Sequence, residues 1–329
     1  MKKKLIIAFS VILFVLVGMV VYVKAGMPRA NFDPAVSIDL TSADIEHGKY
    51  LANHVAACVD CHSKRDWSKF SGPIVPGTVG GGGEYFGPEM GFPGEFYSKN
   101  LTPFHLGDWT DAEIFRAITC GVSKDGKALF PVMPYLYYGK MPKEDVVDII
   151  AYLRRLEPVE HATPPSKPDF PMNFIINTIP KNPKFEEKPD PSDKLAYGRY
   201  LVNAAACMEC HTPVKNGQVI VENAFWGGRA FEMPNGILRS PNLTPDRATG
   251  IGTWSEEMFI KRFKAYEDLS SLPSISEEDY NTLMPWSMYA GMKNEDLAAI
   301  YTYLKSLEPK TNLIEKFSPN KKAVASAEN

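Results

Sequence analysis

The sequence is poor in cysteine and has little excess charge, and both features argue against whole classes of protein. Five cysteines among 329 residues are too few for a disulfide-stapled scaffold of this size. The 36 basic and 39 acidic side chains give a net charge of −3, which argues against a nucleic-acid-binding protein. Long alternating runs of polar and apolar residues, typical of strands, are also missing. The composition is otherwise that of a globular protein, and the length predicts about two domains.

Charge is also absent from a long stretch near the N-terminus. Residues 5–23 form an uncharged run of 19 nearly all apolar residues, preceded by lysines at positions 2–4. A bilayer core about 30 Å thick needs about 20 helical residues, so this run can span it. The lysines predict a cytoplasmic N-terminus, with the chain after Lys24 on the periplasmic side of the inner membrane. We expect residues 1–25 to be a single membrane anchor, with cleavage after Ala25 as a signal peptide as the alternative.

The rest of the chain contains an internal repeat. Gly-x-Tyr-Leu leads into Cys-x-x-Cys-His twice, and Asn-Leu-Thr-Pro recurs at 100–103 and 242–245. Residues 133–158 then align without a gap on residues 284–309, with 12 of 26 positions identical. The same landmarks occur twice in the same order, so the sequence predicts a duplicated domain.

A proline-rich segment separates the two copies. Residues 158–193 hold nine prolines, which argues against long helices and central strands there. The apolar stretch at 170–176 would be unusual in a free tether, so we expect it to lie along a domain surface. The predicted segments are a first domain at 41–158, a linker at 159–191, a second domain at 192–310 and a frayed polar tail at 311–329.

Periodicity and capping residues predict the main helices. Thr110 and Glu113 form a capping box that opens a helix to about Ile118, and Ser255 is the matching N-cap in the second copy. Apolar residues at i, i+3, i+4 and i+7 mark the last helix of each copy. The other expected helices cover about 42–55, 143–156, 192–205 and 294–307.

The two Cys-x-x-Cys-His motifs, at 58–62 and 207–211, carry the chemistry. Two thiols three residues apart can bond covalently to the two vinyl groups of one haem, and the adjacent imidazole then meets the iron. A zinc site would need four ligands close together, and a thioredoxin-like redox pair would need a βαβ setting. The predicted haem attachment residues are Cys58, Cys61, Cys207 and Cys210, and the predicted proximal iron ligands are His62 and His211.

A low-spin electron-transfer haem needs a sixth ligand, and a methionine thioether raises its potential. Each copy offers two methionine positions. Met133 and Met284 are each followed by proline in a loop before the last helix, and we predict them to be the sixth ligands. Met141 and Met292 adjoin the start of the last helix, where packing in the core is the expected role.

Together these motifs resemble those of a di-haem cytochrome c built from two class-I-type domains. They are most similar to the cytochrome subunits of membrane-bound bacterial alcohol and gluconate-type dehydrogenases, and the resemblance covers about residues 42–310. It includes Asn-Leu-Thr-Pro, Trp-Thr-Asp-Ala-Glu at 109–113, the glycine-bounded segment at 121–126 and Met-Pro-Tyr at 133–135. Those subunits usually carry three haem domains, whereas this chain has two haem motifs, so the particular dehydrogenase stays open.

The resemblance implies an all-α fold of tandem duplicated cytochrome c domains with long loops, preceded by one N-terminal transmembrane helix. It implies two covalently bound haem c groups. It also implies that the Gly-x-Tyr helix crosses the last helix, pairing Gly48 and Gly198 with the faces around Tyr152 and Tyr303. Glycine at such a crossing would let an aromatic ring approach the backbone.

We therefore expect a membrane-anchored periplasmic electron carrier, not itself an enzyme. It would accept single electrons from a membrane-bound dehydrogenase or quinol-oxidising complex and pass them to another cytochrome or a terminal oxidase. The alternative is a di-haem enzyme of the peroxidase or thiosulfate dehydrogenase type, with one haem open to substrate. Cys120 is the feature in its favour, as a thiolate competing with Met133; a buried, small hydrophobic role is the other interpretation.

Two further features concern the surroundings of the haem. Arg229 follows two glycines and could pair with a haem propionate, although Glu84 occupies the matching position in the first copy. The glycine run at 80–83 lacks the Gly-Lys-Ser/Thr that phosphate binding requires, and we expect a flexible turn near the haem edge.

Overall fold

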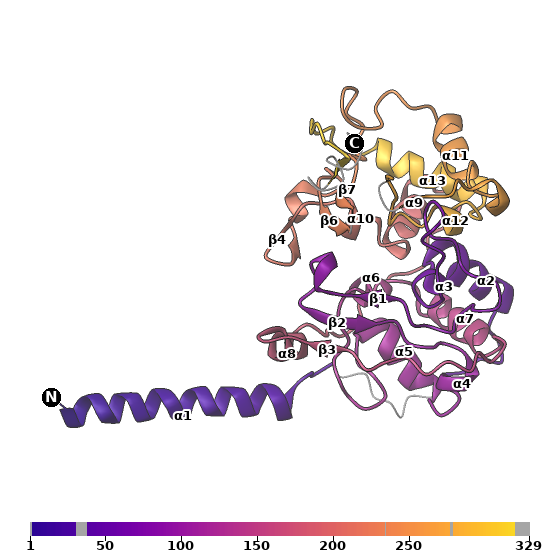
Figure 1. The fold of residues 1–329 in the computed structure, drawn as a ribbon. Coiled ribbons are helices and arrows are strands. Elements are labelled where there is room, and N and C mark those ends of the chain that lie inside the picture. Colours follow the sequence, from indigo (N-terminus) through magenta and orange to yellow (C-terminus); the bar gives the residue numbers. More distant parts are fainter. Residues whose placement is uncertain (1, 31–37, 234, 277–278, 320–329) are drawn as a thin grey trace.

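Helices and short strands follow one another in nearly the same order in the two halves of the chain, and a long helix projects from them (Figure 1). The computed structural model describes residues 2–30, 38–233, 235–276 and 279–319. The α-helices of the N-terminal part are α1 (Lys2–Gly26), α2 (Ile45–Tyr50), α3 (Cys58–Cys61), α4 (Pro103–Leu106), α5 (Asp111–Cys120), α6 (Tyr135–Tyr138), α7 (Lys143–Leu153) and α8 (Met172–Ile175). Those of the C-terminal part are α9 (Lys194–Ala204), α10 (Cys207–Cys210), α11 (Glu256–Lys264), α12 (Trp286–Tyr289) and α13 (Asn294–Lys305).

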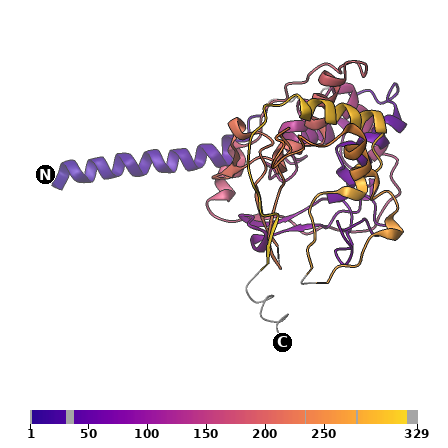
Figure 2. The ribbon, with the colours of Figure 1, turned by 90° about the horizontal axis from the view of Figure 1, so that it is seen from above.

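The N-terminal helix α1 stands away from the rest of the molecule, as Figure 2 also shows. Its 25 residues have a mean hydropathy of 3.0 in the most apolar window, and its side chains are exposed. A helix of this length and composition can cross a bilayer. The expected N-terminal apolar helix is therefore present.

The predicted helices form where the caps and the apolar spacing place them. The Thr110 side chain accepts a hydrogen bond from the Glu113 amide, and the Glu113 side chain accepts one from the Thr110 amide, so the capping box opens α5. Ser255 caps α11 with its side chain alone, which accepts a hydrogen bond from the Met258 amide (3.2 Å). The helix expected over 42–55 begins later, at Ile45. After α2 it continues as a single π-helical turn, η1 (Leu51–Val55).

In each half, the helix that leads into Cys-x-x-Cys-His crosses the last helix at a glycine. A methyl group on Gly48 in α2 would lie 1.9 Å from the Asp148 carbonyl oxygen in α7. On Gly198 in α9 it would lie 2.0 Å from the Ala299 carbonyl oxygen in α13. The expected crossing is present, but its reason differs: the glycine admits a facing backbone carbonyl rather than an aromatic ring. Tyr303 contributes its Cβ, 3.0 Å from the same methyl position.

Three small sheets were not predicted from the sequence. Their strands are two to four residues long, too short to produce an alternating pattern. The strands are β1 (Tyr85–Phe86), β2 (Gly94–Tyr97) and β3 (Lys167–Pro168) in one sheet, β4 (Val214–Lys215) and β5 (Gln218–Val219) in another, and β6 (Ala230–Met233), β7 (Gly236–Arg239) and β8 (Phe317–Pro319) in the third. Single 3₁₀ turns complete the fold: η2 (Pro88–Met90), η3 (Ile176–Thr178), η4 (Val221–Asn223) and η5 (Leu269–Ser271).

The outer strands β3 and β8 extend each half beyond its last helix. Strand β3, inside the predicted linker, pairs antiparallel with β2, so that Gly94 faces Pro168. Strand β8, inside the predicted polar tail, pairs antiparallel with β7, so that Gly236 faces Pro319. The first part of the predicted polar tail therefore belongs to the third sheet, and residues 320–329 lie outside the described part of the chain.

The two halves contact each other through reciprocal hydrogen bonds. The Tyr50 hydroxyl of the first half donates to Asp296 of the second, and the matching Tyr200 hydroxyl donates to Asp145 of the first at 2.6 Å. Asn203 donates to the carbonyl of Tyr137 (3.0 Å). In the opposite direction, His54 Nδ1 donates to the carbonyl of Met288 (2.9 Å). The tyrosines of the two Gly-x-Tyr segments thus exchange bonds across the interface, each donating to the last helix of the other half.

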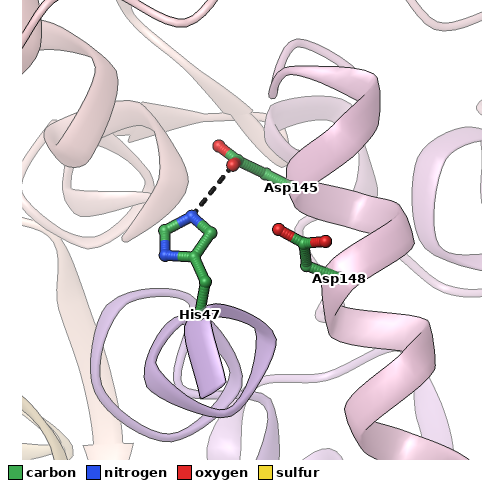
Figure 3. Close-up of side chains that lie close together, drawn as sticks. All are labelled: His47, Asp145 and Asp148. Atoms are coloured by element: carbon green, nitrogen blue, oxygen red, sulfur yellow. Dashed lines mark hydrogen bonds and ion pairs between the residues drawn. The ribbon is translucent and has the colours of Figure 1, made fainter. Parts of the chain in front are cut away.

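One end of this interface brings together His47, Asp145 and Asp148 (Figure 3). His47 Nε2 lies 3.0 Å from Asp145 Oδ1, and these ligand types could hold a metal ion. The Lys188 ammonium group, however, lies 2.7 Å from both atoms and already supplies the positive charge. Asp148 Oδ1 accepts a hydrogen bond from the Asp44 amide (2.8 Å). The cluster therefore ties the segment between the halves to α2 and α7.

The glycine crossings predict that alanine at either position destabilises the protein. The carbonyl that blocks the methyl group belongs to a facing helix and cannot move without shifting it. We expect Gly48→Ala and Gly198→Ala each to lower the free energy of unfolding by about 1–3 kcal/mol, although alanine is normally the better helix former. Denaturant unfolding followed by circular dichroism measures this. Lys49→Ala and Arg199→Ala, on the exposed neighbours, are matched controls; equal effects at all four positions would contradict the argument.

The hydrogen bonds around Asp145 predict a loss of stability in acid. Burial alone would raise the pKa of this carboxyl, but hydrogen bonds from His47, Lys188 and Tyr200 lower the pKa below its ordinary value of 3.8. A carboxyl whose pKa is lowered by folding stabilises the folded protein at pH values above its pKa in the unfolded chain. This stabilisation disappears as the pH falls through its pKa in the folded protein.

We therefore expect Asp145→Asn to be less stable than the unaltered chain at pH 7, and the difference to shrink below about pH 4. Tyr200→Phe, which removes one donor, should cost about 1–2 kcal/mol at pH 7. Thermal unfolding between pH 3 and 7 measures both effects, with Glu46→Gln at an exposed position as the control. A difference in stability between the Asp145→Asn and unaltered chains that does not change with pH would show that the carboxylate charge is not responsible.

Candidate functional site

The two Cys-x-x-Cys-His motifs fold into the same local structure. Each begins with an alanine in the left-handed region, Ala57 and Ala206, both with φ of 49°. A single helical turn follows, α3 or α10, and closes on the histidine: the His62 amide donates to the Cys58 carbonyl (3.1 Å). Side chains three residues apart on a helical turn lie on one face, so each motif presents its two thiols together.

The thiols are available for covalent attachment. All five cysteines fall within the described residues and are free of disulfide bonds. Burial raises the pKa of Cys58, Cys61 and Cys207 to about 12, so these sulfurs are neutral thiols near neutral pH. Neutral thiols and a neutral imidazole together suit covalent attachment of a haem next to a nitrogen ligand.

Each histidine is held through one ring nitrogen by a backbone carbonyl. His62 Nδ1 lies 2.6 Å from the Lys99 carbonyl oxygen, and His211 Nδ1 lies 3.0 Å from that of Pro241. A carbonyl only accepts, so Nδ1 donates, and Nε2 is left with its lone pair for a metal. Burial lowers the pKa of both imidazoles, which favours this neutral form. This donor set fits the proximal ligand of a haem iron.

The Asn-Leu-Thr-Pro repeat explains how these carbonyls are positioned. The Asn100 side-chain oxygen accepts from both the amide (2.8 Å) and the hydroxyl (2.7 Å) of Thr102. Asn242 and Thr244 repeat the arrangement at 2.9 and 2.8 Å. These bonds close a tight turn directly after Lys99 and Pro241. The repeat was recognised in the sequence, but its role was not. A position that contributes only its backbone carbonyl can be occupied by many residue types.

A glycine loop completes the support of each histidine. The Gly82 amide donates to the His62 carbonyl, and the Gly227 amide donates to the His211 carbonyl, both at 2.9 Å. A methyl group on Gly82 would lie 2.6 Å from the Asn100 amide nitrogen, so the close approach requires glycine. The run at 80–83 is thus a hydrogen-bonded turn.

The methionine loops lie against the cysteine motifs of their own half. Tyr138, five residues after Met133, donates from its hydroxyl to the carbonyl of Ala56 (3.0 Å), two residues before Cys58. Tyr289, five residues after Met284, bonds in the same way to Ala205 (3.1 Å). The helical turn after each Met-Pro loop is thereby bonded to the chain just before the cysteine motif of its own half. The Met284 carbonyl also accepts from the Ser71 hydroxyl of the first half (2.7 Å).

Burial separates the two methionine positions of each half. Met133 and Met284 are only partly buried, at the edge of the apolar core, whereas Met141 and Met292 are fully buried within it. The second pair therefore has the packing role expected from its position. The first pair remains the candidate for iron ligation.

Other candidates have roles that do not involve iron. Cys120 is buried beside Thr119, and burial raises the pKa of its thiol, which disfavours a thiolate ligand. Arg229 pairs with the Glu209 carboxylate at 2.6 Å, so its guanidinium is already engaged. The remaining histidines bond to carbonyls or acidic groups or lie against other rings: His47, His54, His105 and His161.

The acidic residue between the two cysteines is paired with an arginine in both halves. Asp60 lies 3.0 Å from the Arg65 guanidinium, and both are buried. Burial raises the pKa of Asp60 to about 6, although Arg65 opposes the shift. Glu209 and Arg229 form the matching pair. Sequence reasoning missed these pairs because the two arginines occupy different positions in the repeat.

A buried indole nitrogen also bears on whether the site of the second half suits a haem. Trp226 Nε1 has no hydrogen-bond partner within the described residues, and Trp226 precedes the Gly227 that holds His211. A buried donor without a partner is costly unless a bound group satisfies it. A haem carboxylate group would satisfy this donor, so the observation fits the haem interpretation.

Comparisons with known proteins agree with these motifs. Residues 195–308 match the cytochrome c family. The chain is 31% identical over 291 residues to the cytochrome c subunit of a quinone alcohol dehydrogenase from Gluconacetobacter polyoxogenes, which covers 82% of this chain and 57% of that protein. It is 29% identical over 282 residues to the fructose dehydrogenase cytochrome subunit of Gluconobacter japonicus, covering 81% of this chain and 53% of that protein.

A smaller relative is also similar. A "Diheme cytochrome c-type" protein of Cereibacter sphaeroides is 30% identical over 199 residues, covering 57% of this chain and 63% of that protein. The chain thus spans between half and two thirds of the length of these relatives. The expected resemblance is confirmed: residues 195–308 match the cytochrome c family, and the chain is similar over most of its length to the cytochrome subunits of a quinone alcohol dehydrogenase and a fructose dehydrogenase.

Proposed function

We propose that the chain is a membrane-anchored, periplasm-facing di-haem cytochrome c that relays single electrons. The carrying observation is shared by both halves: the Cys-x-x-Cys-His histidine has its Nδ1 bonded to a carbonyl, and the helical turn after the Met-Pro loop is bonded just before the cysteine motif. Each half, about 41–158 and 192–310 with its outer strand, would be one cytochrome c domain. The match to the cytochrome c family covers the second half alone, and the proposal extends this assignment to the first half.

The residues have separate tasks in this proposal. The haem, when bound, supplies the iron that changes oxidation state. Cys58 and Cys61 would hold one haem covalently, and Cys207 and Cys210 the other. His62 and Met133 would ligate the iron of the first haem, and His211 and Met284 that of the second. The carbonyl partners keep each imidazole in one orientation and one tautomer. With two protein ligands to each iron, substrate would be excluded from it, which suits a carrier better than an enzyme.

The arrangement of the halves supports transfer between the two sites. The Tyr137 hydroxyl, four residues after Met133, donates to Glu209 between the two cysteines of the second motif (3.2 Å). The helix that follows the first methionine loop therefore touches the second haem motif directly. An electron could cross this contact without either half moving, because helix α6 packs against α9.

The partners follow from the relatives and from the anchor. The similar proteins are cytochrome subunits of dehydrogenases, so we propose a membrane-bound dehydrogenase or quinol-oxidising complex as electron donor. Another cytochrome or a terminal oxidase would accept the electrons. The lysines at 2–4 favour a cytoplasmic N-terminus and hence haem domains on the periplasmic side.

Optical spectra of the haem-loaded protein test the ligand assignment. We expect a far-red sulfur-to-iron band from both ferric haems and no change when carbon monoxide is added to the reduced protein. Met133→Ala and Met284→Ala should each remove about half of the band and open one haem to carbon monoxide, because each removes one of two thioethers. The packing variants Met141→Leu and Met292→Leu should leave the spectrum unchanged, since they keep the buried volume. Carbon monoxide binding to the unaltered protein would favour a substrate-accessible enzyme haem instead.

A reduction experiment tests the relay. Quinol with a membrane-bound dehydrogenase and its substrate should reduce both haems of the full chain in vesicles. Met284→Ala, which lowers the potential of one site by removing the thioether, should slow or prevent reduction of that site. Peroxide or thiosulfate turnover by the chain alone, with no dehydrogenase present, would contradict a carrier role.

A further inference from the structure

A short apolar patch lies exposed on the segment between the halves. We define it as Phe170, Phe174 and Ile175, on and just before helix α8. Phe170 is 80% exposed and Ile175 44% exposed, and the Phe170 ring packs edge-on against Phe174 at 6.1 Å. The expectation that 170–176 lies along a domain surface therefore holds only in part, since two of the three patch residues face outward.

The patch sits beside the end of helix α1. The Lys24 ammonium group donates to the carbonyl of Asn173 (3.2 Å) and lies 4.5 Å from the centre of the Phe174 ring. Helix α1 also contacts both α8 and the following turn η3. Figure 1 shows α8 on the side of the body from which α1 projects.

This contact fixes the depth of the patch relative to a membrane. The apolar run at 5–23 rises about 28 Å at 1.5 Å per residue, which matches a hydrocarbon core of about 30 Å. Lys24 then lies among the lipid head groups. Tyr22 and Arg29 also suit this layer, and the Arg29 guanidinium lies 5.0 Å from the centre of the Tyr22 ring. A segment in contact with Lys24 shares that level.

The patch is also tied firmly to the first half. Strand β3, directly before it, pairs with β2. The Asp169 amide donates to the Pro93 carbonyl (3.0 Å), and the Asn173 amide donates to the Asp169 carbonyl (2.8 Å). Any contact that restrains the patch therefore also restrains the first half, which contains His62.

We propose that this patch inserts into the head-group layer of the bilayer that α1 spans, giving the protein a second membrane contact. Aromatic and branched apolar side chains at a membrane interface are suited to this layer. Exposed Lys167 and Lys181 flank the patch and suit anionic lipid, with Asp169 as an opposing charge. Two contact points would restrict how the haem domains tilt and turn above the membrane. The inference rests on the membrane-spanning role of α1 and not on the haem ligands.

Spin-label accessibility in the full haem-loaded chain tests the proposal. A nitroxide on Phe170→Cys would be compared in vesicles of phosphatidylcholine and phosphatidylglycerol with labels on Val15→Cys and Leu313→Cys. Val15 lies within α1, and Leu313 is 89% exposed in the second half, so they define the lipid and water limits. Labelling is selective, because Cys120 is buried and the other cysteines lie in the haem motifs.

In vesicles we expect collisions of the Phe170 label with oxygen to exceed those with a water-soluble nickel complex several-fold, as at Val15, and the ratio to reverse at Leu313. A Phe170 label as accessible to nickel as Leu313, with Val15 protected, would overturn the proposal. Protection that appears only when a dehydrogenase is added would also overturn it and identify the patch as a protein-binding surface. Carbon monoxide binding, which would refute the proposed function, leaves these ratios unaffected, so the two failures are distinguishable.

A second variant guards against an effect of the label. Phe170→Ser with Ile175→Ser removes the apolar side chains from exposed positions, so folding should be unchanged. In vesicles, the backbone amides within 170–176 should exchange hydrogen several-fold more slowly in the unaltered chain than in the double variant. Equal exchange in both chains would overturn the proposal.

Discussion

The close approach of two helices at a glycine is the constraint on which each half of this protein depends. The helix that contains Gly48 leads into the first cysteine motif, and the helix it crosses follows the first methionine loop. Fixing the two helices backbone to backbone therefore also fixes where the proximal histidine and the methionine loop start. Gly198 does the same in the second half. With the crossing set, hydrogen bonds such as that from Tyr138 to Ala56 can close the remaining distance.

A second layer of support surrounds the histidines and comes entirely from backbone. Lys99 and Pro241 contribute their carbonyls, and Gly82 and Gly227 contribute their amides. The side chains at these positions can vary, as lysine against proline shows, because only the path of the backbone matters. The two halves can thus differ in sequence and still hold an imidazole in the same state.

The sequence predicted the parts of the fold that depend on side-chain identity. Capping at Thr110 and the spacing of apolar residues in the last helices led to the correct elements. Strands β3 and β8 were missed because their pairing depends on a distant hairpin and not on their own two or three residues. The glycine crossing was expected with a ring as partner, since a backbone carbonyl has no residue type to suggest it. The iron ligands themselves stay predictions.

The reciprocal bonds between the halves affect how the protein comes apart. Tyr50 reaches the last helix of the second half, and Tyr200 reaches that of the first. If one half unfolded, the other would lose a partner for a buried carboxylate and would face water with an unpaired surface, which is costly. We therefore expect the halves to melt in one cooperative transition rather than as two independent modules. At this interface, each of the two similar halves therefore depends on the other.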